Sequence, residues 1–97
     1  MRDPFAPLRN ATAAALLHAP AATTEALRVA VAVGTAPPEL HELVQKIRTR
    51  PYAVTDRDVN SLRDKFTEDQ LFEIIVAAAF GAAQDRLASA LRALEVA

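Results

Sequence analysis

The 97-residue chain contains no cysteine, and only two of its residues are glycine. Without a thiol it cannot form a disulfide, a thiolate zinc site, a cysteine nucleophile or a dithiol redox pair. The two glycines, Gly34 and Gly81, are far apart, so no glycine-rich phosphate-binding loop is present. Ser61 and Ser89 have no histidine and aspartate at a recognisable spacing, so the sequence shows no serine nucleophile. The absence of cysteine is typical of a reducing compartment.

The chain also lacks an excess of charge of either sign, with 11 lysines and arginines against 12 aspartates and glutamates. A protein that binds nucleic acid by neutralising phosphates needs a basic excess, and so does a basic helix that lies on a membrane surface. The basic residues of the middle of the chain are interspersed with Asp56, Asp58 and Asp64. We therefore expect neither nucleic acid nor a membrane as a partner.

Long hydrophobic runs are missing as well. The N-terminal stretch MRDPFAPLRN has no apolar segment of the kind found in signal peptides. The apolar run over residues 74–84 is too short to cross a bilayer. These two features predict a soluble, cytoplasmic protein.

What is present is apolar and rich in alanine. Hydrophobic residues make up 52% of the chain, and few of them are aromatic. Scarce glycine and the lack of alternating β-branched residues predict an all-α fold. We expect a compact bundle of four to five helices formed by a single domain over residues 8–97. Residues 1–7 carry two prolines and are expected to be a flexible N-terminal arm.

Start and stop signals divide the first half of the domain into helices. Residues 8–18 suit a short alanine-rich helix that ends before Pro20. Thr23 or Thr24 caps the next one, EALRVAVAV, and Gly34 stands where a left-handed residue ends a helix. Valine-rich segments also form strands, but the apolar residues here follow helical spacing.

The helix that follows begins with two prolines in its first turn, where their missing N–H groups are tolerated. Its apolar residues recur at i, i+3, i+4 and i+7 and form one stripe. They are Leu40, Leu43, Val44 and Ile47. Pro51 ends the element.

Two capping boxes occur in the second half, twelve residues apart. TDRD (Thr55 to Asp58) and TEDQ (Thr67 to Gln70) each place an acceptor at the N-cap and a polar partner three residues later. They predict a short helix, a tight turn and a long final helix from about Glu68 to Leu94. A helix–turn–helix DNA-binding domain has a similar layout. The second helix here opens with acidic and then apolar residues, however, and such a surface would be repelled by phosphate and could not form hydrogen bonds with base edges.

The long helix is apolar nearly all round as far as Ala83, so more than one of its faces must be covered. A cluster of small residues between Ala77 and Ala83 lets neighbouring backbones approach closely, and Phe80 fills the space beyond. One protomer of this size cannot cover such a helix alone. We therefore expect a homo-oligomer with the C-terminal helix at its interface.

The segment from about Leu27 to Leu94 resembles the C-terminal half of the alkylhydroperoxidase D-like family, the superfamily that includes carboxymuconolactone decarboxylase. The resemblance lies in ALRVAVAVG followed by VTDRDVNSLRDKFTEDQLFEIIVAAAFGAAQDRL. Asp85-Arg86-Leu87 stands where members carry an Asn-Arg-Leu-like tripeptide. The resemblance implies an all-α bundle that assembles into trimers or hexamers.

The redox members of that family act through a Cys-x-x-Cys pair, and this chain has none. Cysteine-dependent peroxide reduction is thus excluded. The decarboxylase branch works with polar residues that stabilise an enolate, so an enzyme stays open. Arg86 alone corresponds to a recurrent family residue.

Glu73 is the first candidate site residue, because it is the lone acid at the head of the apolar run. If it were buried, its pKa would rise toward that of a general base. The alternative is a solvated carboxylate, or one paired with an arginine such as Arg63 or Arg86.

His41 and Arg86 are the other two candidates. His41 lies in the acidic stretch PELHELV and suits a general acid–base or a metal site shared across an oligomer axis, or else a solvated face. Arg86 suits either bidentate hydrogen bonding to a carboxylate ligand or a contact that ties one helix to another. Glu42 and Lys46, at i and i+4, form an ordinary surface ion pair.

The sequence predicts no cofactor and no metal. Its leading interpretation is a non-catalytic, oligomerising helical protein with a structural or accessory role, with a second protein left open as a partner. The alternative is an enzyme or binder of a small organic acid or lactone, with Glu73, Arg86 and His41 at a subunit interface. A third is a subunit that completes another chain's catalytic half.

Overall fold

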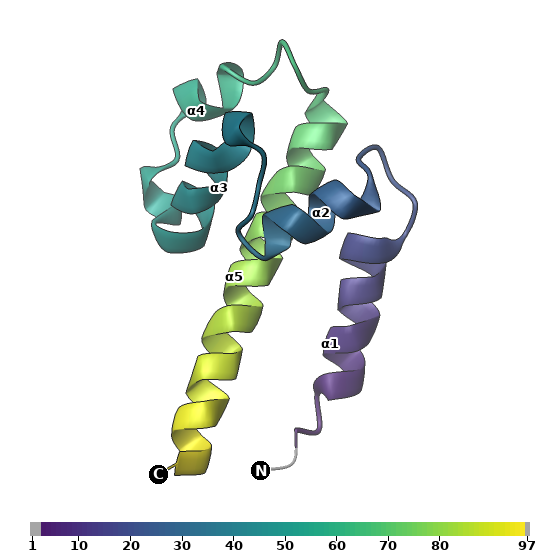
Figure 1. Cartoon of the computed structure of the whole chain (residues 1–97), viewed down its shortest axis with the longest axis vertical. Coiled ribbons are helices and arrows are strands. Elements are labelled where there is room, and N and C mark those ends of the chain that lie inside the picture. The colour runs from purple at the N-terminus through teal and green to yellow at the C-terminus, as the bar shows by residue number, and fades with distance from the viewer. Residues whose placement is uncertain (1–2, 97) are drawn as a thin grey trace.

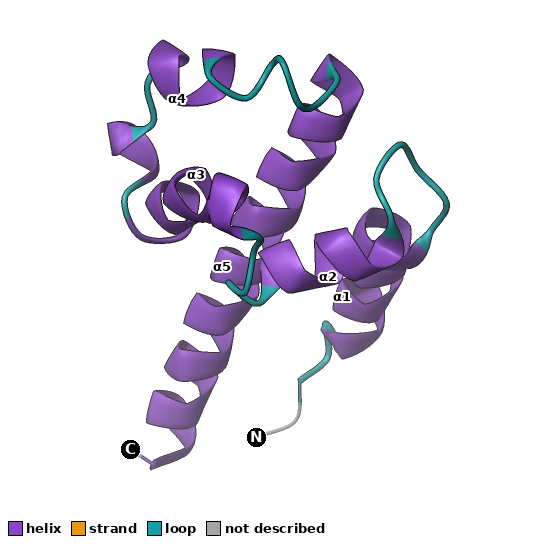
Figure 2. Ribbon diagram, turned by 45° about the horizontal axis from the view of Figure 1, so that its top comes forward, coloured by secondary structure: helices purple, strands orange, loops and turns teal. Residues whose placement is uncertain are grey.

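The computed structural model describes residues 3–96, and in this part of the chain every regular element is helical, as the composition predicts (Figure 1). Five α-helices follow one another: Ala6–Ala13 (α1), Glu25–Ala32 (α2), Pro38–Thr49 (α3), Asp56–Asn60 (α4) and Glu68–Val96 (α5). Two short helical turns lie between them, a π turn over Ala14–His18 and a 3-10 turn over Pro51–Ala53. Figure 2 shows the loop between α4 and α5 at one end of the molecule and the loop between α1 and α2 at its side.

Helix α1 begins at Ala6, two residues before the predicted start, with Pro7 in its first turn. Asp3 supports this start: its carboxylate accepts a hydrogen bond of 3.0 Å from the backbone N–H of Phe5 and pairs with Arg9. Of the predicted N-terminal arm, Met1 and Arg2 lie outside the described residues. The helix widens into the π turn, which ends at His18 with Ala19 as its C-cap, ahead of Pro20.

Helix α2 confirms the helical interpretation of the valine-rich segment. The hydroxyl of Thr24, rather than that of Thr23, caps it by accepting a hydrogen bond from the N–H of Leu27. Gly34 follows the helix with a φ of +86°, the left-handed conformation that glycine adopts without strain.

Both predicted capping boxes are present. The hydroxyl of Thr55 accepts from the N–H of Asp58, and the carboxylate of Asp58 accepts from the N–H of Thr55. Thr67 and Gln70 make the same reciprocal pair at the start of α5. The start of α5 at Glu68 is therefore dictated by local sequence.

The N-terminal half of α5 is the centre of the fold, because α2 and α3 both pack against it. The predicted stripe of α3 is buried, together with Leu71, Ile74, Ala77 and Ala78 of α5. Gly81 marks the crossing with α2, where a β-carbon would lie 1.8 Å from the carbonyl oxygen of Ala32. The small-residue cluster thus brings two backbones together, although Ala79 and Ala83 are exposed.

The C-terminal half of α5 extends beyond the body formed by α2, α3 and α4 (Figure 1). Helix α1 extends toward the same end, where both termini lie. The molecule measures 47 × 29 × 18 Å, and its radius of gyration of 14.5 Å exceeds the ~12.5 Å expected for a compact chain of this length. Residues Glu68–Glu95 of α5 are long and apolar enough to cross a membrane, as judged by length and composition alone. The core helices of soluble proteins meet the same criterion.

Candidate functional site

Glu73 holds the loop that leads into α2. Its carboxylate accepts hydrogen bonds from the backbone N–H groups of Ala22, at 3.0 Å, and Thr23, at 2.8 Å. The hydroxyl of Thr23 donates a third bond of 2.6 Å to the same carboxylate. Nearby, the side-chain amide of Gln70 donates to the carbonyl of Ala22, at 3.4 Å. One turn of α5 therefore fastens a loop about fifty residues earlier in the chain.

Arg28 lies beneath this loop and is only 2% exposed. Its guanidinium donates to two backbone carbonyls, those of Leu16, at 3.1 Å, and Ala19, at 2.5 Å. These carbonyls lie at the end of the π turn, where the helical ladder stops and leaves acceptors without partners. The Nε atom of Arg28 is buried and has no hydrogen-bond partner. Arg28 thus fixes the end of the first helical segment against α2.

The electrostatics of Glu73 oppose a general-base role. The hydrogen bond from the Thr23 hydroxyl is the largest influence, and it lowers the pKa of Glu73 below its ordinary value. Partial burial acts in the opposite direction, but the Thr23 hydroxyl, the two backbone N–H groups and the charge of Arg28 together outweigh it. The upward shift expected for a buried acid does not occur, because the loop supplies donors to the ionised form.

An open hollow of about 400 Å³ lies beside this loop. Its lining runs along the chain from His18 to Glu25 and includes Arg28. At its rim the Nδ1 atom of His18 and the carboxylate of Glu25 are 2.7 Å apart. The hollow therefore combines a buried cation with backbone and hydroxyl groups.

Arg86 ties α5 to the end of α3. Its guanidinium donates a hydrogen bond of 2.7 Å to the carbonyl of Arg48, one of the last carbonyls of α3. The preceding residue, Asp85, pairs with the side chain of Arg48. Arg48 in turn donates to the carbonyl of Ala32 at the end of α2. Three helix segments meet at these residues, which matches the interpretation of Arg86 as a tie between helices.

The three candidate residues do not meet within one protomer. Glu73 and Arg86 are thirteen residues apart on α5, which separates them by roughly 20 Å along the helix axis. His41 is exposed on α3. Neither arginine considered as a partner of Glu73 is among its hydrogen-bonding groups, because Arg63 pairs with Glu68 and Arg86 contacts α3.

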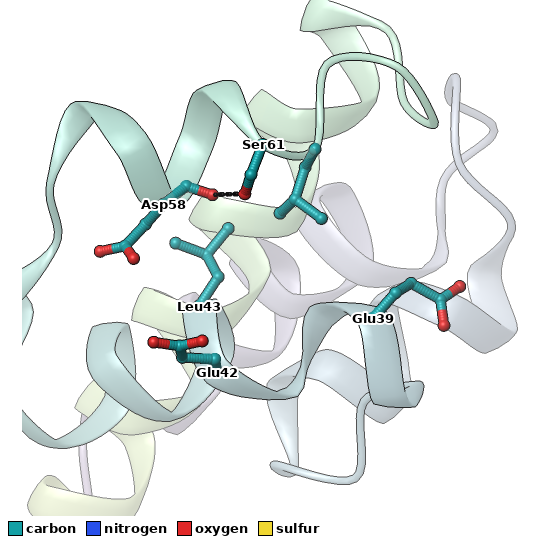
Figure 3. A pocket seen from close by; sticks show the side chains of 6 residues that line it. Glu39, Glu42, Leu43, Asp58 and Ser61 are labelled. Carbon is teal, nitrogen blue, oxygen red and sulfur yellow. Dashed lines mark hydrogen bonds between the residues drawn. The ribbon is translucent and has the colours of Figure 1, made fainter.

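A second hollow, of about 50 Å³, lies between α3 and α4 (Figure 3). Glu39, Glu42, Asp58 and Ser61 line it, and the Ser61 hydroxyl donates to the backbone carbonyl of Asp58 at 3.1 Å. A space of this size holds a few water molecules at most. Among the described residues, no group of three or more histidines and acids is placed to hold a metal ion.

Lys46 neutralises part of this acidic surface. Its ammonium group lies 3.0 Å from the carboxylate of Asp58 and 3.5 Å from that of Glu42. The predicted Glu42–Lys46 pair is therefore confirmed, but Asp58 is the closer partner. The N–H of Thr55 and the charge of Lys46 hold the pKa of Asp58 below its ordinary value, and Asp58 raises the pKa of Lys46.

Sequence reasoning missed Arg28 and Thr23. The arginine stands inside the apolar stretch EALRVAVAV, and that position was the one available signal that its side chain is buried. For Thr23 the sequence predicts only a helix cap. Its contact with Glu73 joins residues fifty positions apart and has no local signature.

Comparison with known proteins adds no further assignment. No protein-family model, curated protein or solved structure matches this chain.

Proposed function

We propose that this protein is a non-redox, homo-oligomerising helical protein of the alkylhydroperoxidase D-like type, with a structural or accessory role. One observation carries the proposal. The protomer exposes 6395 Å² of surface. A folded monomer of 10.4 kDa is expected to expose about 5,400 Å². The excess of roughly 1,000 Å² is comparable to the ~800 Å² that each partner contributes to a standard protein interface.

Several large apolar side chains are exposed, some on the elements that extend from the body and others, such as Phe72, on the body itself. Phe72 and Leu94 of α5 are 67% and 54% exposed, and Leu87 is also exposed. Phe5 and Leu8, at the start of α1, are exposed to a similar extent. Exposed apolar side chains of this size favour association with another surface.

The polar candidates support a structural role rather than catalysis. Glu73 is ionised and engaged by a loop, and Arg86 is bonded to a helix end. His41 is solvated on α3. Each of these side chains either faces water or makes an intramolecular contact that stabilises the fold.

Sedimentation equilibrium of the purified protein tests this proposal. We expect a mass that is a multiple of 10.4 kDa. The expected states are a trimer or a hexamer, as the resemblance to the alkylhydroperoxidase D-like family implies. A mass of one protomer over the whole concentration range would contradict the proposal. A second protein as partner would instead be recovered by native mass spectrometry of a pull-down.

A binder of small organic acids, or a lactone-processing enzyme, is the second candidate. The hollow that Arg28 lines favours it, because a buried guanidinium is the usual partner of a carboxylate ligand. Titration with malonate, followed by amide NMR, tests this alternative. Saturable shifts of the Ala22 and Thr23 amides would support it, and unchanged spectra at saturating malonate would contradict it.

A further inference from the structure

The first helical segment, residues 6–18, is attached to the rest of the molecule by few apolar contacts. Leu17 is the one buried residue of this segment, and Leu16 packs partly against the core. Helix α1 buries no residue, and its main contacts are with the π turn that continues it. Figure 1 shows α1 extending away from α2, α3 and α4. A segment that buries so little apolar surface opens more easily than the core elements do.

Arg28 supplies the main polar attachment of the segment. Its guanidinium donates to the carbonyls of Leu16 and Ala19, which lie at the end of the π turn. The contact between His18 and Glu25 also links the segment to α2, but both side chains are half exposed, so it contributes little. The first helical segment is therefore held to the body chiefly by one arginine and one leucine.

The loop that follows the segment is fastened separately. Glu73 of α5 accepts hydrogen bonds from the N–H groups of Ala22 and Thr23, so this part of the loop belongs to the body. Pro20 and Ala21 lie between the two attachments, and both are exposed. They form the natural pivot if the segment moves while α2 and α5 stay in place.

We propose that the first helical segment opens as a unit about Pro20 and Ala21, and that its end is an internal competitor for Arg28. In the closed state the carbonyls of Leu16 and Ala19 occupy the guanidinium. In the open state the guanidinium is free to bind the carboxylate of a small organic acid. The ligand part of this proposal rests on the second candidate function, the binder of small organic acids, whereas the opening of the segment does not.

The hydrogen bonding of Arg28 favours the exchange of partners. In the closed state the guanidinium meets two neutral carbonyls, and its buried Nε atom has no acceptor. A carboxylate accepts from Nε and a terminal nitrogen together, and such charge-assisted bidentate pairs are stronger than bonds to neutral carbonyls. The hollow of about 400 Å³ that Arg28 lines gives the ligand a place to bind. The closed segment thus lowers the apparent affinity for the ligand by the fraction of molecules that are open.

Native-state hydrogen exchange of the full chain, followed by NMR, tests the opening. The amide of Ala19, bonded to the carbonyl of Ala14 at 2.9 Å, reports on the segment, and the amide of the buried Ala78 reports on α5. Relative to intrinsic rates, we expect Ala19 to exchange at least about tenfold faster than Ala78. Ile47→Val, in the core face of α3, should accelerate Ala78 about threefold to tenfold and leave Ala19 unchanged.

Leu17→Ala is the matched variant within the segment. Because it removes the buried contact that is lost on opening, it should accelerate the exchange of Ala19 at least about tenfold. Circular dichroism checks that this variant folds. Leu17→Val removes less of the side chain and provides a milder second variant, with a smaller acceleration in the same direction.

Malonate is the probe for the competition at Arg28. Because it binds the open state, malonate should accelerate the exchange of Ala19, whereas a general stabilising effect of the salt would slow it. Malonamide, which is neutral, should have no effect. Leu17→Ala should bind malonate more tightly than wild type, by the same factor by which it increases opening, and Arg28→Met should not bind it.

The possible outcomes separate the opening, the competition and the binder. If Ile47→Val accelerates Ala19 and Ala78 equally, the segment opens only with global unfolding and the proposal is overturned. Independent opening with tighter malonate binding by Leu17→Ala supports both parts. Equally tight binding by wild type and Leu17→Ala overturns the competition but not the binder. Absence of malonate binding by both overturns the competition together with the second candidate function.

Discussion

Gly81 of α5 lies directly against the carbonyl of Ala32 at the end of α2, where an added β-carbon would come within 1.8 Å of the oxygen. The two helices can cross at this distance only because position 81 has no side chain. Glycine is a poor residue for a helix interior, so its presence here reflects packing rather than local preference.

Replacing Gly81 with alanine should therefore destabilise the protein, although helix propensity alone favours alanine by ~1 kcal/mol. We expect a loss of about 1–3 kcal/mol, because α2 must move away from α5. Chemical denaturation measures this change. A gain in the free energy of unfolding would show that the helices do not make this close crossing.

Glu73→Gln should lower the free energy of unfolding by about 1–2 kcal/mol at neutral pH, because the loop donors lose an ionised acceptor. The folded pKa of Glu73 lies below its ordinary value. The contribution of the ionised Glu73 side chain to the free energy of unfolding is therefore complete at pH values above the ordinary pKa, and it is lost as the pH falls through the folded pKa.

The difference between wild type and Glu73→Gln should accordingly shrink toward zero in acid. Asp3 and Asp58, whose pKa values are also lowered, titrate in both proteins, so their effects cancel in the difference. Glu39→Gln, on the exposed side of α3, is the matched control and should change stability little. A difference that is independent of pH would contradict the assigned role of the Glu73 charge.

Arg28→Met should cost about 2–4 kcal/mol, because it removes the donors from two carbonyls and the cation near Glu73. Arg63→Met, at an exposed arginine, is the control and should stay within ~0.5 kcal/mol of wild type. In a double-mutant cycle with Glu73→Gln, the two effects should not add. Simple additivity would mean that Arg28 and Glu73 act independently.

Asp58→Ala should lower the melting temperature more than Glu42→Ala does. Asp58 completes the capping box of α4 and binds Lys46, whereas Glu42 is a solvated and more distant partner of that lysine. Differential scanning calorimetry compares the two variants. Equal shifts would show that the cap and the Lys46 contact contribute nothing beyond a surface ion pair.

Local signals predicted most of the fold. The boxes at Thr55 and Thr67 and the left-handed Gly34 fixed helix ends, because their effects act within a few residues. The amphipathic stripe of α3 likewise identified its buried face. The π turn and the early start of α1 were not predicted, since they depend on Asp3 and on the end of the segment that Arg28 holds.

The candidate site was less predictable, because its contacts join distant parts of the chain. The sequence marks Glu73 as the lone acid at the head of the apolar run, but its partners Ala22 and Thr23 and the downward direction of its pKa depend on where the loop lies. The sequence does not predict the burial of Arg28, because an arginine within a helix is ordinarily solvated. Only the packed structure shows that it is buried.

The thermal midpoint as a function of protein concentration tests the central claim most directly. If copies of the chain share the apolar surface of α5, folding is coupled to association, and the midpoint should rise with concentration across about a hundredfold dilution series. The account predicts that rise for the wild type. A midpoint that stays constant over the series, with the mass of one protomer throughout, would contradict it.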